Sequence, residues 1–136
     1  MTRRYVGAYG VLVQHEAVLL VRKMRGPYEG SLDLPGGDIE HGEHPEDAVR
    51  REFVEETGLL IRPVRQLPAY SRVTGDQHHL GFFYEVALLR DTDPLKTEPD
   101  GEDAGGALWV PLSELARHWL SPLAVQAVAA LKTTHC

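Results

Sequence analysis

Residues 37–59 read GDIEHGEHPEDAVRREFVEETGL, and this stretch decides the fold. Pro45 suits the first position of a helix, because the N–H that proline lacks has no partner there. Glu46 and Asp47 favour the positive end of the same helix, and Gly58 favours its C-terminal stop. The stretch therefore predicts a helix that begins at Pro45 and ends just before Gly58.

Three carboxylates recur on one side of this helix, which we expect over Pro45–Thr57. Glu52, Glu55 and Glu56 have the spacing i, i+3 and i+4, so their side chains lie within about 6 Å of one another. Like charges this close repel unless they are solvated, paired with cations or bound to metal. Oxygen ligands of this kind suit Mg²⁺ or Mn²⁺. The alternative is an ordinary solvated helix face.

The whole stretch resembles the Nudix box, whose pattern is Gly, five residues, Glu, seven residues, then Arg-Glu-apolar-x-Glu-Glu-x-Gly-apolar. Every position has its match here, at Gly37, Glu43, Arg51, Glu52, Phe53, Glu55, Glu56, Gly58 and Leu59. The family usually has an aliphatic residue where this chain has Phe53. A chance match in a chain of this length is on the order of one in a million, so the resemblance is specific.

The resemblance implies both a fold and a reaction. The implied fold is an α+β fold, the Nudix-type αβα sandwich with a mixed β-sheet. The implied reaction is hydrolysis of a nucleoside diphosphate linked to another group, by attack of metal-activated water on phosphorus. The resemblance implies Mg²⁺ or Mn²⁺ as cofactor, held by Glu52, Glu55, Glu56 and the carbonyl of Gly37.

Candidate catalytic residues follow from the same resemblance. We favour Glu52 as the carboxylate that takes the proton, with Glu102 or Asp103 in the loop before Trp109 as the second choice. Solvated loop acids are the alternative for that pair. Arg51 is expected to pair with Glu43 and brace the loop against the helix, and direct contact of Arg51 with substrate phosphate is the alternative.

The rest of the chain predicts strands on both sides of this helix. Apolar and β-branched runs predict strands at 5–13, 17–21, 59–64, 67–73, 79–89 and 108–110. The first two strands are expected to form a hairpin around a turn at His15 and Glu16. Strands, a helix, more strands and a terminal helix are the order typical of a mixed sheet between helices.

Turns, loops and short helices fill the remaining segments. Turns are expected at 34–37 and 74–76, and glycine and proline content predicts loops at 26–31 and 91–106. Ser113 is expected to cap a short helix that runs through Trp119. Pro122 is expected to open a final helix that reaches about Lys132.

Composition limits the partners of the chain. The 136 residues suit a single domain over 1–136, and 14 basic against 20 acidic residues give a formal net charge of −6. Binding to nucleic acid is disfavoured, because it needs clustered Lys and Arg. The lone cysteine, Cys136, excludes an internal disulfide. Without a long apolar stretch we expect a cytoplasmic protein that acts on a small nucleotide-type molecule, and a homodimer is left open.

Side chains that contact the substrate are less well defined by the sequence. The aromatic and histidine candidates for stacking on a base or sugar are Tyr28, Tyr70, His78, His79, Phe82 and Tyr84, and packing in the core is the alternative for each. Arg22, Lys23 and Arg25 face either the phosphates or solvent. The family often places a Trp shortly before Leu-Pro-Gly-Gly, where this chain has Leu32 and Asp33.

Three other roles of the same fold are alternatives to nucleotide hydrolysis. A nucleotide-binding regulator that has lost hydrolysis is expected to have a broken box, and this box is intact. A diphosphate isomerase usually relies on an internal cysteine and a longer chain, and neither is present here. An RNA 5′-end pyrophosphohydrolase is disfavoured by the acidic balance, because RNA adds further phosphates to neutralise.

Overall fold

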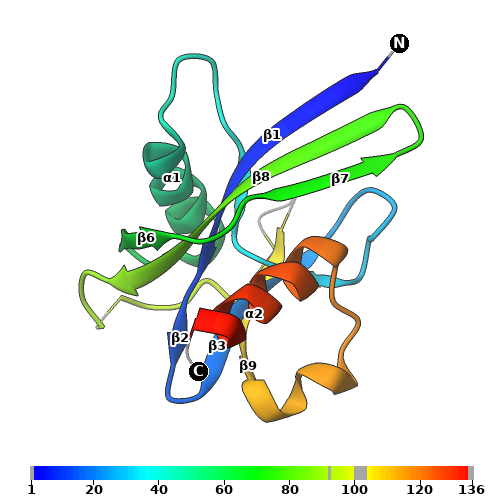
Figure 1. The fold of residues 1–136 in the computed structure, drawn as a ribbon. Helices are drawn as coiled ribbons and strands as arrows, with labels where there is room; N and C mark the ends of the chain where they lie inside the picture. Colours follow the sequence, from blue (N-terminus) through cyan, green and yellow to red (C-terminus); the bar gives the residue numbers. More distant parts are fainter. Residues whose placement is uncertain (1, 92, 100–103, 135–136) are drawn as a thin grey trace.

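The protein is described here from a computed structural model that covers residues 2–91, 93–99 and 104–134 (Figure 1). The strands are β1 (Arg3–Val11), β2 (Val13–Gln14), β3 (Ala17–Lys23), β4 (Leu32–Asp33), β5 (Gly36–Asp38), β6 (Ile61–Gln66), β7 (Tyr70–Thr74), β8 (Gln77–Leu88) and β9 (Ala104–Pro111). The helices are α1 (Pro45–Thr57), the 3₁₀ helix η1 (Leu112–Arg117) and α2 (Pro122–Thr134).

The strands form two sheets. One has the order β5-β1-β8-β6, with β7 also paired to β8, and the other has the order β2-β3-β4, with β9 paired to β3. Strands β1 and β8 are parallel over Arg3–Val11, whereas the other pairings are antiparallel. The predicted α+β fold with a mixed sheet is confirmed, and the strands divide between two sheets.

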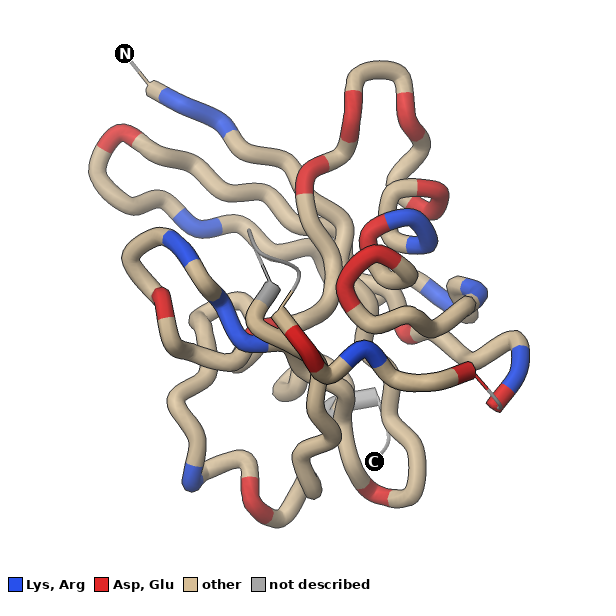
Figure 2. The backbone as a smooth tube through the Cα atoms, turned by 180° about the vertical axis from the view of Figure 1, so that it is seen from behind, with Lys and Arg blue, Asp and Glu red and all other residues tan. Residues whose placement is uncertain are grey.

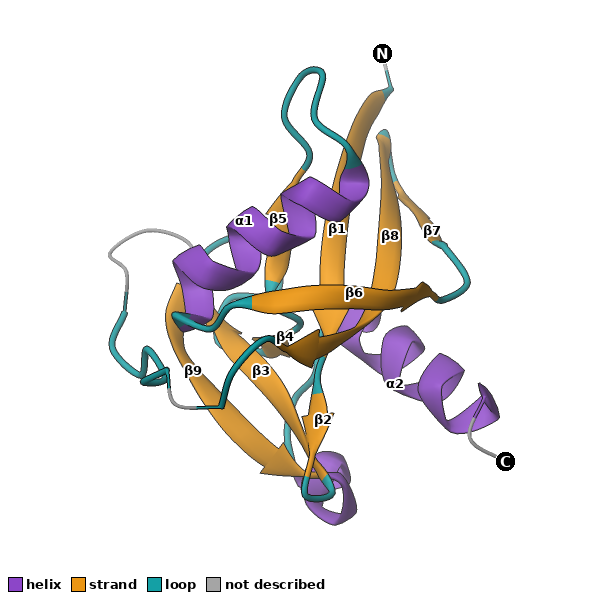
Figure 3. Ribbon diagram, turned by 90° about the vertical axis from the view of Figure 1, so that its left-hand side faces the viewer, coloured by secondary structure: helices purple, strands orange, loops and turns teal. Residues whose placement is uncertain are grey.

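The two helices cover opposite faces of the strands, as Figure 3 shows. Side chains alternate along β1, so Tyr9 and Val11 belong to the core cluster that contains α2, whereas Ala8 and Leu12 belong to the cluster that contains α1. Phe53 of α1 is fully buried in the second cluster. This alternation makes the αβα layering.

The expected hairpin is only partly present. His15 and Glu16 form the turn with positive φ of 50° and 62°, and Val13 and Gln14 pair with β3 as expected. The longer strand β1 instead pairs with β5 and β8. Its partner β8 lies more than 60 residues further along the chain, so no local sequence pattern indicates that pairing.

Helix α1 has the predicted ends. It begins at Pro45, and Gly58 ends it with a left-handed φ of 79° and an N–H that donates to the carbonyl of Val54. His44 at the N-cap makes no side-chain cap. Since the acidic side chains Glu46 and Asp47 lie in the first turn, the helix dipole stabilises the start of α1 without a cap.

Three local predictions are wrong. Residues 36–38 continue past the expected turn as β5, because Gly36 and Gly37 pair with β1. Strand β9 begins at Ala104, inside the expected loop 91–106, since its backbone pairs with β3 although its glycines carry no strand signal. Ser113 caps nothing: η1 already starts at Leu112, whose N–H donates to the carbonyl of Glu16.

Candidate active site

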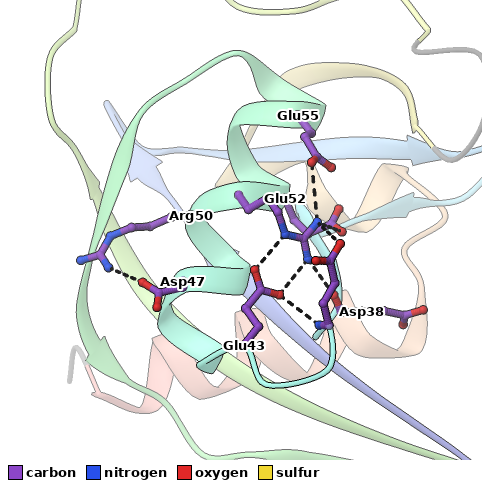
Figure 4. Close-up of polar contacts among 8 residues, drawn as sticks. Asp38, Glu43, Asp47, Arg50, Glu52 and Glu55 are labelled. Atoms are coloured by element: carbon purple, nitrogen blue, oxygen red, sulfur yellow. Dashed lines mark hydrogen bonds and ion pairs between the residues drawn. The ribbon is translucent and has the colours of Figure 1, made fainter.

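Arg51 of α1 joins the helix to the loop that follows β5. Its Nε and Nη2 donate to the two carboxylate oxygens of Glu43 at 2.9 and 3.0 Å. Figure 4 labels Glu43 and marks its polar contacts with dashed lines. Nη2 also donates to the carbonyl of Asp38 at 3.0 Å. The predicted pair of Glu43 and Arg51 is confirmed, and it ties the loop to the helix.

Glu43 has a strongly perturbed acidity. The hydrogen bonds from Arg51 and from the backbone N–H of Glu40 lower the pKa of Glu43 to about 2. The hydrogen bonds to Glu43 and to Glu52 raise the pKa of Arg51 above its usual value. Both groups are therefore charged throughout the physiological range of pH.

Glu52 lies between Arg51 and Gly37. Nη1 of Arg51 donates to Oε1 of Glu52 at 2.9 Å. A Cβ added at Gly37 would come within 2.8 Å of the Glu52 carboxyl group, so a larger residue at this position would displace that carboxyl group. Burial raises the pKa of Glu52, and the contact with Arg51 opposes that rise.

Glu56 is buried and Glu55 is exposed, although the two are neighbours on α1. Glu56 has 8% of its surface exposed, and its Oε1 accepts the N–H of Gly36 at 2.8 Å. Gly36 has a φ of 150°, and a Cβ there would collide with the carbonyl of Ala8. The side chain of Glu55 is 54% exposed and lies 3.6 Å from Arg51.

A cleft of about 310 Å³ borders these carboxylates. One side is an acidic wall from β5 and α1, formed by Gly36, Gly37, Asp38, Glu52 and Glu56. Glu55 does not line the cleft. The structure therefore brings Glu52, Glu56 and Gly37 together around one space and leaves Glu55 outside this lining, 3.6 Å from Arg51. Figure 2 shows acidic positions gathered along the loop before α1 and along α1 itself.

Two of the three cations named in the sequence also line the cleft. Lys23 and Arg25 border it, whereas Arg22 does not and instead donates to the carbonyl of Gly30 at 3.0 Å. Nζ of Lys23 lies 3.4 Å from Oδ2 of Asp33, which is buried. The cleft thus combines carboxylates with cations that suit phosphate groups.

Asp33 and Ser121 attach the start of α2 to the cleft. Oδ1 of Asp33 accepts the hydroxyl of Ser121 at 2.7 Å and the N–H of Leu34 at 2.9 Å. The Ser121 hydroxyl also accepts the N–H of Ala124 at 3.1 Å, so Ser121 caps α2. No local pattern predicts this contact, because 88 residues separate Asp33 from Ser121.

The aromatic candidates divide into two groups. Tyr28, Tyr70 and His79 line the cleft. By contrast, Phe82 and Tyr84 pack in the core cluster under α1, and His78 instead contacts Ser71. Tyr9 also lines the cleft and was not among the sequence candidates, because its strand reads as an ordinary apolar run.

The carboxylates fit a divalent metal in their chemistry. Among the described residues, no three His, Cys, Asp or Glu side chains are already arranged to hold an ion. Instead, Arg51 balances Glu52 and Glu55, and the Gly36 N–H satisfies Glu56. The donors are all oxygen atoms, the type that Mg²⁺ and Mn²⁺ prefer, so these residues fit such an ion. Glu102 and Asp103 lie outside the described residues.

Comparison with known proteins identifies relatives of the whole fold. The sequence model of the NUDIX domain matches residues 1–131. The structure superposes on a MutT NUDIX hydrolase from Burkholderia pseudomallei with a TM-score of 0.79 and 27% identity, covering 95% of this chain and 98% of that one. It also superposes on the NUDIX domain of Shewanella oneidensis NrtR, crystallised with ADP-ribose, with a TM-score of 0.77 and 21% identity over 100% of this chain and 90% of that one.

Curated relatives are similar over part of their length. An ADP-ribose pyrophosphatase of Methanocaldococcus jannaschii is 33% identical over 101 residues, which are 73% of this chain and 59% of that protein. A putative 8-oxo-dGTP diphosphatase of Bacillus subtilis is 33% identical over 74% of this chain and 61% of that protein. The chain thus spans about three fifths of the length of these relatives. In the described ranges, no helix is both long and apolar enough to cross a membrane.

Proposed function

Because the chain belongs to the NUDIX domain family, we propose that it hydrolyses a phosphoanhydride bond in a nucleoside diphosphate linked to another group. Water attacks one phosphorus, the P–O bond of the anhydride breaks, and the leaving phosphate departs with the bonding electron pair. The observation that carries the proposal is the shared cleft of Glu52, Glu56 and Gly37.

Glu52, Glu55 and Glu56, with the carbonyl of Gly37, are the proposed ligands of Mg²⁺ or Mn²⁺. When bound, such an ion neutralises phosphate charge and lowers the pKa of water. The acidic wall needs this compensation, because a diphosphate entering next to Glu52 and Glu56 is otherwise repelled. Lys23 and Arg25 supply further positive charge in the same cleft.

Glu52 is the carboxylate that we favour as proton acceptor. Arg51 holds Oε1 of Glu52, which leaves Oε2, beside Gly37, to take the proton from the attacking water. Arg51 is then a positioning residue: Glu43 holds its guanidinium, and the guanidinium orients the carboxylate of Glu52. Glu102 and Asp103, which precede β9 in the sequence, are the second candidates.

A substrate panel tests the proposal directly. The compounds are ADP-ribose, 8-oxo-dGTP, a nucleoside triphosphate, a nucleotide sugar and a dinucleoside polyphosphate, each with Mg²⁺ or Mn²⁺ and each repeated in excess chelator. We expect hydrolysis of at least one compound to a nucleoside monophosphate, orthophosphate or pyrophosphate, and its loss in chelator. Tight binding of a compound without turnover supports a nucleotide-binding regulator instead, and turnover in chelator contradicts the metal assignment.

A further inference from the structure

Tyr9 lies flat across a pair of glycines at the base of the cleft. Gly7 of β1 and Gly81 of β8 are register partners in the parallel pair. A Cβ at Gly7 would collide with the phenol of Tyr9, and a Cβ at Gly81 would lie 3.3 Å from Cε2 of the same ring. The two glycines therefore make the space in which the Tyr9 ring lies along the sheet.

The hydroxyl of Tyr9 reaches His79, which also lines the cleft. Tyr9 Oη and His79 Nε2 are 2.8 Å apart, a hydrogen-bond distance. The His79 ring meets Tyr9 edge-on at a centroid distance of 5.8 Å and meets Tyr70 edge-on at 5.4 Å. Three contacts thus fix the plane of the imidazole.

One nitrogen of His79 is left for a ligand. In the part of the chain that the structure describes, the hydrogen bond of the His79 ring uses Nε2. Burial lowers the pKa of His79, which favours the neutral ring with one donor and one acceptor. With Nε2 occupied by Tyr9, Nδ1 is available as the second polar atom of the ring.

His78 provides a contrast on the same strand. Side chains alternate along β8, so His79 and Phe83 share the face of Tyr9 and Tyr70, whereas His78 lies on the opposite face. His78 contacts the hydroxyl of Ser71 at 2.8 Å and does not line the cleft. The two adjacent histidines therefore have different surroundings, and only one can meet a ligand of the cleft.

We propose that His79, oriented by Tyr9, is a specificity-determining residue that recognises the nucleobase of the substrate in the cleft that Tyr28 also lines. The inference rests on the proposed function, since it assigns the non-phosphate part of that substrate. Tyr9 and Tyr70 are buried, so the polar group of this wall is the fixed imidazole nitrogen, which can hydrogen-bond to a base edge. Tyr28 is only partly buried and lines the same cleft, so its ring is the aromatic side chain on which a base can stack. A bare sugar phosphate offers no such plane.

Binding of mononucleotides tests this assignment without turnover. The probes are AMP, GMP, CMP and UMP, with ribose 5-phosphate as the matched compound that lacks a base, and none contains an anhydride bond. Calorimetry with the intact protein is expected to give at least one nucleotide an affinity about tenfold or more above that of ribose 5-phosphate, since base stacking is worth about 1–3 kcal/mol.

Variants then assign the preference to His79. We expect His79→Ala to weaken binding of the preferred nucleotide about tenfold, which corresponds to about 1.4 kcal/mol, because a hydrogen bond and its packing are lost. Binding of ribose 5-phosphate is expected to stay within about twofold of wild type. His79→Gln, which keeps one donor and one acceptor, is expected to recover part of the loss. Tyr9→Phe keeps the ring on the glycines, removes the hydroxyl and is expected to cost about threefold. His78→Ala is the control and is expected to bind as wild type.

Several results overturn the assignment. They are equal binding of nucleotides and ribose 5-phosphate by wild type, absence of binding of either, a His79→Ala variant that behaves like His78→Ala, and equal weakening of ribose 5-phosphate in His79→Ala. Thermal unfolding of each variant separates these results from misfolding, and Tyr9→Phe provides a conservative second measurement. If the base preference holds while no panel compound is hydrolysed, the proposed function fails alone. If compounds are hydrolysed without a base preference, only the role of His79 fails.

Discussion

The guanidinium of Arg51 holds the carboxylate of Glu43 through two hydrogen bonds, at 2.9 and 3.0 Å. We predict that the Glu43 carboxyl titrates with a pKa of about 2, measured by carbon NMR of the side chain. Arg51→Lys is expected to raise this pKa toward its ordinary value, because lysine cannot reproduce the planar fork. A pKa of Glu43 that is ordinary in wild type contradicts the pair in solution.

The same pair makes stability depend on acidic pH. Folding lowers the pKa of Glu43 from 4.5 to about 2, so its stabilisation is present above pH 4.5 and is lost as pH falls through about 2. We expect Glu43→Gln to lower the free energy of unfolding in urea at pH 7, and the difference from wild type to shrink between pH 4.5 and 2. A difference that does not change with pH assigns the effect to packing.

Substitution of the glutamates of α1 at the cleft is expected to lower kcat, whereas substitution of another carboxylate of the same helix is not. Glu52→Gln or Glu56→Gln keeps the shape, removes the charge from the cleft and is expected to lower kcat about 10²-fold or more. Glu55 is exposed and does not line the cleft, so Glu55→Gln is expected to have the smallest effect of the three. Asp47→Asn is the control, since Asp47 is exposed and pairs with Arg50. Near-wild-type rates in all three Gln variants mean that the helix face is solvated surface.

The effect on stability of a smaller side chain at Phe53 is expected to depend on Gly10, which the Phe53 ring covers. A Cβ at Gly10 would lie 2.9 Å from Cε2 of the buried Phe53 ring, so the aromatic side chain and Gly10 fit each other. We expect Phe53→Ala to cost about 3–5 kcal/mol and Gly10→Ala to cost about 1–3 kcal/mol by overpacking. The double variant Phe53→Leu with Gly10→Ala should lose less free energy of unfolding than the single variants Phe53→Leu and Gly10→Ala added together, as measured by urea unfolding. Strict additivity shows that the two residues do not interact.

Local signals explain which parts of the fold could be predicted from the sequence. Both ends of α1 were predicted, because Pro45 and Gly58 act on the backbone where they stand. The pair of Glu43 and Arg51 was also predicted, since both residues belong to the box and lie only eight positions apart in the sequence. The division into two sheets was not, because the parallel pairing of β1 with β8 joins segments without any local pattern.

The candidate site could also be predicted only in part, because some of its contacts join residues far apart in the sequence. The resemblance named Glu52 and Glu56, which the structure places beside one cleft. The contact of Tyr9 with His79 spans 70 residues and depends on which face of each strand borders the cleft. Alternation along a strand separates two faces and does not say which one is the core. Tyr9 was therefore missed, and the six aromatic and histidine candidates could not be sorted.

Ser121 and Ser113 give a matched test of the attachment of α2. Ser121 donates to the buried Asp33 and caps α2, whereas Ser113 is exposed and lies within η1. We expect Ser121→Ala to lower the free energy of unfolding by about 1–2 kcal/mol, because it leaves a buried carboxylate oxygen with one partner fewer. Ser113→Ala is expected to change it by less than about 0.5 kcal/mol. Equal effects of the two changes contradict the role of Ser121.

The last prediction concerns the acids ahead of β9. The preceding segment is attached to the end of α1, because the N–H of Lys96 donates to the carbonyl of Thr57 at 2.8 Å and its Nζ donates to the carbonyl of Glu55 at 2.9 Å. Lys96, six and seven residues before Glu102 and Asp103 in the sequence, is thus held next to the helix that carries the glutamates.

Closure of this loop over bound substrate is the hypothesis under test. If one of its acids takes the proton, Glu102→Ala or Asp103→Ala should lower kcat with little change in KM, whereas a binding role should raise KM. Lys96→Ala is the companion variant: it removes the side-chain bond to Glu55 and is expected to weaken both parameters modestly if attachment of the loop matters. Wild-type kinetics in both single variants and in the double variant leave Glu52 as the sole candidate base.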